Sequence, residues 1–237
     1  MPASDIARAK RAAREKVWTI LERENAAPLG VHGHIPAFEG AEQTSARLGE
    51  LDVWRHARVV KANPDRAQFP VRLRALRDGK LLYMAVPRLA SLKPFFMVDP
   101  TVSNLSFDDA ATSDGAATDS PKVGPDEMRP VDLVVCGSVA VNRRGVRVGK
   151  GAGYSDIEVA LLTEAGLVGP QTTIVTTVHQ LQVVDAELPE AEHDFSVDVI
   201  VTPTETITCG PPRRPRGILS EALGAAMIRE IPVLRNR

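Results

Sequence analysis

Residues 147–156 have the composition of a loop that binds phosphate. They read Arg-Val-Gly-Lys-Gly-Ala-Gly-Tyr-Ser-Asp, so three alternate glycines stand among two cations, an aromatic residue and a carboxylate. Because glycine has no Cβ atom, it lets backbone N–H groups approach an anion closely. Arg147 and Lys150 could supply the counter-charge. The stretch therefore predicts a loop that can hold the phosphates of a nucleotide.

Two predicted elements would position this loop. The apolar run 131–141 before it is typical of a buried strand. After it, residues 156–165 carry apolar side chains at helical spacing, namely Ile157, Ala160, Leu161 and Leu162. The loop would then lie at the N-terminus of a helix, where unpaired N–H groups and the helix dipole attract anions.

The residues alone leave a second interpretation open. Ser155 and Glu158 have the spacing of a capping box, which would start a helix with no ligand present. The glycine spacing also fits neither the P-loop nor the dinucleotide fingerprint, because Tyr154 stands where a P-loop has Lys and Ser or Thr. A nucleotide at this loop would need another type of cradle.

Composition and charge restrict the class of protein. With 43% hydrophobic and 25% charged residues, the 237-residue chain has the make-up of a folded α/β protein, and we expect a single domain over 1–237. A formal net charge of −1 creates no field that would draw it to nucleic acid or membrane. Its start has the pattern of a charged helix rather than a signal peptide. We therefore expect a cytoplasmic protein in which any binding of an anion depends on a local group of charges.

Apolar segments along the chain predict alternating strands and helices. We expect helices over residues 4–25, 41–51 and 219–229, and strands over 59–61, 71–76, 81–86, 131–141, 173–178 and 197–201. Residues 103–130 shift to a polar composition and predict a solvated, partly disordered excursion. Nearly continuous β-branched strands alternating with helices indicate a mostly parallel sheet flanked by helices, a Rossmann-like α/β fold.

Several motifs follow one another in the order of a known family. They are Asp132-Leu133-Val134-Val135, the loop 147–156, Gln182-Val183-Val184-Asp185, His193-Asp194 and Val197-Asp198, with Ala9-Lys10-Arg11 and Arg14 in the opening helix. Together they resemble the 5-formyltetrahydrofolate cyclo-ligase family, also called methenyltetrahydrofolate synthetases. The resemblance is strongest to the divergent branch of this family whose members contain a methenyltetrahydrofolate synthetase domain. It implies an α/β domain of the cyclo-ligase type.

The resemblance implies an ATP-dependent ring closure. In the family, ATP phosphorylates the formyl oxygen of 5-formyltetrahydrofolate, N10 attacks the activated carbon, and phosphate leaves to give 5,10-methenyltetrahydrofolate and ADP. Such a transfer needs charge neutralisation and alignment more than a covalent nucleophile. The cofactors that it implies are ATP and Mg²⁺, and the partner is a folate or a related carbonyl and amine compound.

Residue by residue, the resemblance also implies the roles at the site. Arg147, Lys150 and Tyr154 would be catalytic. The nucleotide would be bound by Lys10, Arg14, Gly149, Gly151, Ala152, Gly153, Tyr154 and Ser155. Asp156 and Asp198 would hold Mg²⁺, which prefers one or two carboxylates together with phosphate oxygens. From the residues alone, Asp156 could instead cap a helix, and Asp198 could be a turn residue at a strand edge.

The chain departs from the family mainly on the folate side. The usual Tyr-Tyr-Asp-Arg is here 154–157, Tyr-Ser-Asp-Ile, and only Glu42 is a candidate for the acidic substrate contact. Two functions follow: an enzyme that activates a carbonyl oxygen, or a catalytically silent nucleotide- or folate-binding regulator. For such a regulator the resemblance to this branch suggests a role near thiamin metabolism. A metal carboxylate kept together with several phosphate-binding cations favours the enzyme.

Overall fold

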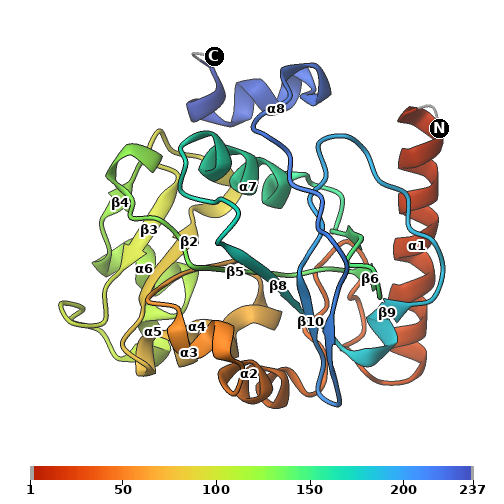
Figure 1. Cartoon of the computed structure of the whole chain (residues 1–237), viewed down its shortest axis with the longest axis horizontal. Helices are drawn as coiled ribbons and strands as arrows, with labels where there is room; N and C mark the ends of the chain where they lie inside the picture. The colour runs from red at the N-terminus through yellow and green to blue at the C-terminus, as the bar shows by residue number, and fades with distance from the viewer. Residues whose placement is uncertain (1–2, 236–237) are drawn as a thin grey trace.

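The computed structural model describes residues 3–235 and has an eight-stranded sheet covered by helices on both faces (Figure 1). In spatial order its strands are β11 (Thr206–Thr208), β10 (Val199–Val201), β8 (Thr173–Thr177), β5 (Leu133–Cys136), β1 (Val59–Ala62), β2 (Leu81–Ala85), β3 (Phe95–Val98) and β4 (Lys122–Val123). The run from β10 to β2 is parallel, and the edge strands pair antiparallel. The predicted mostly parallel α/β fold is confirmed.

Apolar clusters on the two faces of the sheet hold the helices. One face packs on α7 (Tyr154–Glu164) and the segment that follows α8 (Ala225–Glu230), which lie above the sheet in Figure 1. The other face packs on α2 (Ala41–Gly49), α3 (Asp52–His56) and α4 (Phe69–Arg77), below it. The strands are buried on both sides, which explains why they read as continuous apolar runs.

A small second sheet sets the glycine loop beside the first helix. It consists of β7 (Arg147–Val148), β6 (Ala140–Asn142) and β9 (Val183–Val184). The long helix α1 (Ala3–Arg23) buries Val17, Trp18 and Leu21 in the cluster that also contains Ala140 and Val148. The loop follows β7 and leads into α7. It therefore connects to α7 at its end and faces α1 on its other side.

Three predicted elements are wrong. Residues 71–76 are helical in α4, because Val71 and Arg72 are buried together with Ala75 and Leu76, which is the spacing of a helix face. The run 131–141 is two strands in different sheets, divided after Cys136. The last predicted helix, 219–229, is a 3-10 turn (Ser220–Ala222) followed by α8.

The polar excursion is ordered, contrary to our expectation. It contains α5 (Phe107–Ala110), α6 (Ser113–Asp119) and the edge strand β4. Ser106 and Thr112 cap the two helices by accepting hydrogen bonds from Asp109 N and Gly115 N. Ala110, Ala111 and Ala116 are buried in the core below the sheet. Small apolar residues between polar ones therefore suffice to fix this segment.

None of the helices within residues 3–235 is long and apolar enough to cross a membrane.

Candidate functional site

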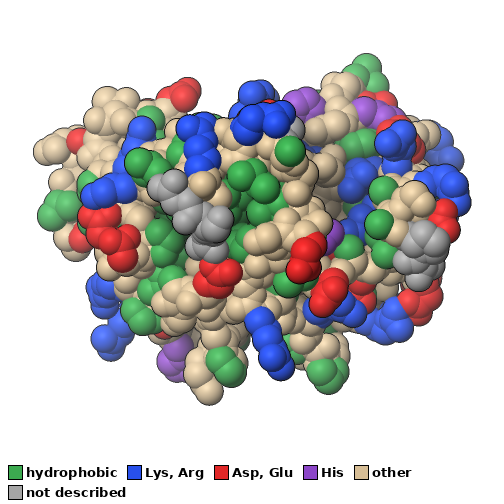
Figure 2. Space-filling view, turned by 90° about the horizontal axis from the view of Figure 1, so that it is seen from above, with side chains coloured by type: hydrophobic (Ala, Val, Ile, Leu, Met, Phe, Trp, Pro, Cys, Tyr) green, Lys and Arg blue, Asp and Glu red, His purple; other side chains and the backbone are tan. Residues whose placement is uncertain are grey.

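A cavity of about 1200 Å³ lies where α1, the glycine loop and the carboxyl ends of β1 and β2 meet. Asn63 and Asp65 follow β1 on its wall, and Pro87 and Arg88 follow β2. Ligands of open α/β sheets bind at this edge of the sheet. The face seen from above mixes cationic and acidic side chains (Figure 2), so any selection for anions must come from the local arrangement of charges.

The glycine loop forms one wall of this cavity. All eight residues predicted to bind the nucleotide line it, and six of them belong to the loop: Gly149, Gly151, Ala152, Gly153, Tyr154 and Ser155. Gly151 and Gly153 have φ values of +103° and +73°, which favour glycine. Gly153 precedes the first residue of α7 and the helix begins at Tyr154. The free N–H groups of the first turn of α7 therefore lie at the end of this loop.

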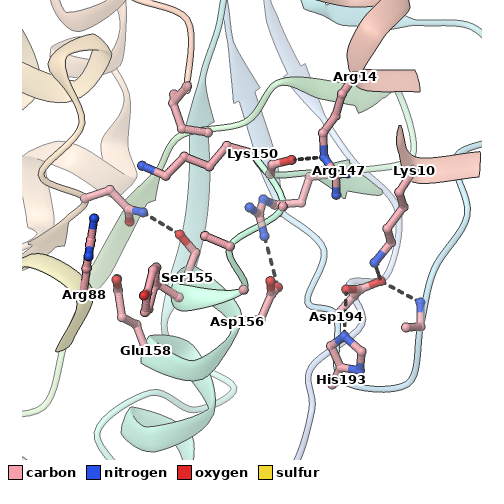
Figure 3. Close-up of a pocket in the computed structure, with 18 of the residues that line it drawn as sticks. Lys10, Arg14, Arg88, Arg147, Lys150, Ser155, Asp156, Glu158, His193 and Asp194 are labelled. Carbon is pink, nitrogen blue, oxygen red and sulfur yellow. Dashed lines mark hydrogen bonds and ion pairs between the residues drawn. The ribbon is translucent and has the colours of Figure 1, made fainter. Parts of the chain in front are cut away.

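Two cations of α1 line the cavity, and one of them, Arg14, contacts the loop. The Arg14 Nε atom donates a hydrogen bond to the carbonyl oxygen of Gly149 at 2.7 Å, and its guanidinium lies against Gly151. Burial and the nearby Arg11 lower the pKa of Arg14 from its ordinary value. Lys10 is paired with Asp194, which also accepts from Ala191 N at 2.6 Å (Figure 3).

A buried ion pair joins the loop's first cation to its carboxylate. The Arg147 Nη1 atom lies 3.2 Å from Asp156 Oδ1, and the guanidinium stacks on Phe195 at 4.5 Å from the ring centre. Burial raises the pKa of Asp156, although Arg147 opposes the shift. Burial acts to lower the pKa of Arg147. Asp156 and other neighbours favour the charged form more strongly, so the pKa is raised. The Asp156 side chain keeps 19% of its surface and faces the cavity.

Lys150 extends across the cavity to the loop after β1. Its Nζ atom lies 2.8 Å from Asp65 Oδ1. Arg72 of α4, which is buried, holds that loop by donating to the carbonyl oxygens of Asn63 at 2.5 Å and Asp65 at 2.9 Å. Sequence reasoning missed Asp65, because its position follows from a strand end and not from a motif.

The two predicted magnesium ligands are not brought together. Asp198 does not line the cavity; it precedes β10, accepts from Ile174 N at 2.6 Å and pairs with Arg214. Asp194 lines the cavity instead and raises the pKa of Asp156 by its charge, so these two carboxylates are neighbours. Among residues 3–235 no group of three or more His, Cys, Asp and Glu side chains could hold a metal ion alone. Any cation here would need ligand oxygens as well.

The two glutamates considered in the sequence, Glu42 and Glu158, also have other places than expected. Glu42 lies on α2 and is not part of the cavity wall, whereas Glu158 is. The predicted capping box is wrong, because Gly153 is the N-cap of α7 without a side-chain cap. Glu158 instead pairs with Lys61 of β1. The pairing was not predictable, because 97 residues separate the two partners.

Comparisons with known proteins show the family of this chain. Residues 6–203 match the model of the 5-formyltetrahydrofolate cyclo-ligase family. The methenyltetrahydrofolate synthase domain-containing proteins of Mus musculus and Homo sapiens are 42% and 40% identical, each over 96% of this chain but 62% and 61% of their own length. The chain therefore spans about 60% of the length of these relatives. The Aquifex aeolicus 5,10-methenyltetrahydrofolate synthetase shares the fold, with a TM-score of 0.53 at 19% identity over 91% of this chain and 95% of that one. On these grounds the chain belongs to the 5-formyltetrahydrofolate cyclo-ligase family.

Proposed function

We propose that this chain is an ATP- and Mg²⁺-dependent ligase that activates a carbonyl oxygen by phosphorylation and closes a ring through a neighbouring amine. The observation that carries the proposal is the convergence of Arg14, Arg147 and Lys150 on one glycine loop at the N-terminus of α7. Three cations with free N–H groups form a site for a polyphosphate rather than for a single carboxylate.

The volume of the cavity supports two substrates. Pockets for one drug-sized ligand occupy roughly 300–1,000 Å³. The cavity here holds about 1200 Å³. A nucleotide on the glycine loop would leave the end near Arg88 and Glu158 for the second substrate. Two substrates side by side are what a direct phosphoryl transfer requires.

Asp156 and Asp194 are the residues that would hold Mg²⁺. Both carboxylates face the cavity, and each already has a cationic partner, Arg147 and Lys10 respectively. Two carboxylates completed by phosphate oxygens and water suit Mg²⁺, which seldom binds in an all-protein cage. Bound there, the ion would neutralise charge on the phosphate oxygens.

The remaining roles follow from the position of each side chain. Arg14 and Lys10 would bind the phosphates from α1, and Arg147 would hold them from below the loop. Lys150 extends across the cavity to Asp65 and would contact the phosphoryl group in transfer. Tyr154 lies at the junction of both halves and would pack on the second substrate. Water would be kept away from the reacting atoms by the walls of the cavity.

The substrate that we propose is 5-formyltetrahydrofolate or a related compound with a carbonyl beside an amine. The alternative is a silent nucleotide- or folate-binding regulator. Asp156, Asp194 and Lys150 favour catalysis, because a binding module has no need of metal carboxylates together with a transition-state cation. The test is to measure ADP release with MgATP alone and with added 5-formyltetrahydrofolate. Stimulated release supports the enzyme, whereas ATP binding without release supports the regulator.

A further inference from the structure

A buried ion pair beneath the glycine loop has no part in the proposed phosphoryl transfer. Lys61 of β1 is fully buried and pairs with Glu158 of α7, whose side chain is 4% exposed. The Lys61 Nζ atom also donates to Asn63 Oδ1 at 2.8 Å, and Asn63 Nδ2 donates to Ser155 Oγ at 2.6 Å. One lysine therefore connects the end of β1 with the first turns of α7.

The fold alone gives no reason for charges at this place. Removing two charges from water costs several kcal/mol per ion, and well-packed apolar residues often replace a buried pair without loss of stability. Here one member of the pair, Glu158, lines a cavity, while Lys61 is buried behind it. Placement of a charged pair beside a cavity is typical of a functional site.

The second oxygen of Glu158 is available to a ligand. Glu158 lines the cavity, and the hydrogen bond that its carboxylate accepts within residues 3–235, from Lys61, goes to Oε2 and leaves Oε1 unused. In Figure 3 the carboxylate points into the space beside Arg88 and Ser155. An open acceptor is thus held in one orientation by the lysine behind it.

Apolar and aromatic side chains line the cavity on this side, together with the cation of Arg88. Ala85, Val86 and Pro87, which directly precede Arg88, line the same cavity, and Tyr154 lies one turn before Glu158 on α7. Apolar and aromatic side chains with a few well-placed polar groups are the usual lining of a small-molecule site. The free oxygen of Glu158 is an acceptor, so a ring bound against it must donate.

We propose that Glu158 is a specificity-determining residue, whose Oε1 atom accepts a hydrogen bond from an N–H group on the ring of the second substrate. Lys61 already balances the charge of Glu158, so a neutral N–H donor suffices and a cationic ring is not needed. The proposal rests on the proposed function only in assigning this end of the cavity to the second substrate.

The isosteric variant Glu158→Gln gives a sharp test. An ammonium group has only donors. Lys61 will therefore turn the amide oxygen of the variant toward itself, and the amide NH₂ group will face the cavity. The substitution converts an acceptor into a donor with almost no change of shape. The wild-type site should therefore prefer a ring with an N–H donor, and the variant a ring with an acceptor.

Two flat bicyclic probes measure this exchange without any assumption about the natural substrate. Indole has a neutral N–H donor and no acceptor, whereas isoquinoline at pH 8 has an acceptor and no donor. NMR titration of the whole protein should show that the wild type binds indole more tightly than isoquinoline by roughly tenfold, as expected for a hydrogen bond to a charged group. In Glu158→Gln the preference should reverse.

A second variant and a second ligand separate this proposal from a structural role and from the proposed function. The apolar double variant Lys61→Met/Glu158→Leu should lose the preference between the probes but keep the wild-type melting temperature. Titration with a non-hydrolysable ATP analogue should be unaffected in Glu158→Gln. Failure of wild-type protein to prefer indole, or an unchanged preference in Glu158→Gln, would overturn the proposal. If the preference between indole and isoquinoline reverses as expected but 5-formyltetrahydrofolate is not turned over, the proposed function alone fails.

Discussion

The Arg147 guanidinium lies 3.2 Å from the Asp156 carboxylate, so the cation proposed for phosphate and the carboxylate proposed for Mg²⁺ neutralise each other. Arg147 is buried, and a lone charge there would be costly. MgATP would bring an anion for Arg147 and a cation for Asp156 at the same time. The ion pair explains how both groups can lie beside one cavity in the ligand-free protein without an uncompensated charge.

This exchange of partners predicts that Asp156 acts through the metal. Asp156→Asn should weaken ATP binding in magnesium by tenfold or more, by the order of one lost charged contact. In EDTA the affinity should be unchanged or tighter, because Arg147 is then free for phosphate. Isothermal titration with a non-hydrolysable ATP analogue in both buffers measures the difference.

Asp198→Asn is the matched control for this experiment. Asp198 pairs with Arg214 outside the cavity, so its replacement should leave the effect of magnesium on ATP affinity as in the wild type. If Asp198→Asn abolished that effect and Asp156→Asn did not, the assignment of the metal to Asp156 and Asp194 would be wrong.

The conformation of the loop predicts that Gly151 tolerates no side chain. Its φ of +103° is strained for any other residue, and an added Cβ would lie 3.3 Å from the Arg14 guanidinium. Gly151→Val should therefore reduce ATP affinity strongly. Gly210→Val, at an exposed glycine with open space around it, should not. Normal ATP binding by Gly151→Val in the same titration would place the cradle elsewhere.

Lys150 should affect turnover more than nucleotide affinity. A contact that strengthens in the transition state lowers kcat, whereas a uniform contact changes only KM. Lys150→Ala should reduce kcat by about 10²–10³, the usual effect of losing one electrostatic stabiliser. Steady-state ADP release measures both constants. Lys93→Ala removes another exposed lysine with an acidic partner, Glu127, and is expected to behave as wild type. A raised KM with intact kcat would make Lys150 a binding residue.

His179 should make stability depend on pH. Burial lowers the pKa of His179 from 6.5, and its Nδ1 atom accepts a hydrogen bond from Leu181 N at 3.2 Å. Just below pH 6.5 the unfolded chain binds a proton that the folded chain does not, so the free energy of unfolding falls as the pH falls. Urea unfolding at pH 7.5 and 5.5 should show a smaller difference in His179→Gln than in the wild type. The exposed His56 provides the control, since His56→Gln should keep the wild-type difference.

The sequence predicts well what depends on neighbours along the chain. Residues 147–156 show the glycine loop directly, because glycine, cation and helix start are adjacent. A short alternating segment such as 71–76 suits both a strand and a helix, and only packing against β1 and β2 selects the helix. The break after Cys136 has the same origin, since Gly137 is approached by Ile35 and Gln68, which come from distant segments.

Long-range pairs account for the errors at the site. Lys10 with Asp194 and Lys61 with Glu158 each join residues far apart in the sequence. The motif His193-Asp194 already contained the carboxylate that lines the cavity, but nothing in its spacing distinguished it from Asp198. Topology decides between them, because Asp198 directly precedes β10 and Asp194 lies in the loop that faces α1.

The most direct test of the central claim uses 5-formyltetrahydrofolate labelled with oxygen-18 in its formyl group. The protein is incubated with this compound and MgATP, methenyl product is followed by its absorbance, and the released phosphate is analysed by mass spectrometry. We predict that product and ADP form in equal amounts and that each phosphate carries one labelled oxygen. Product formation with unlabelled phosphate, or the absence of product with ATP bound, would contradict an enzyme that activates the formyl oxygen by phosphorylation.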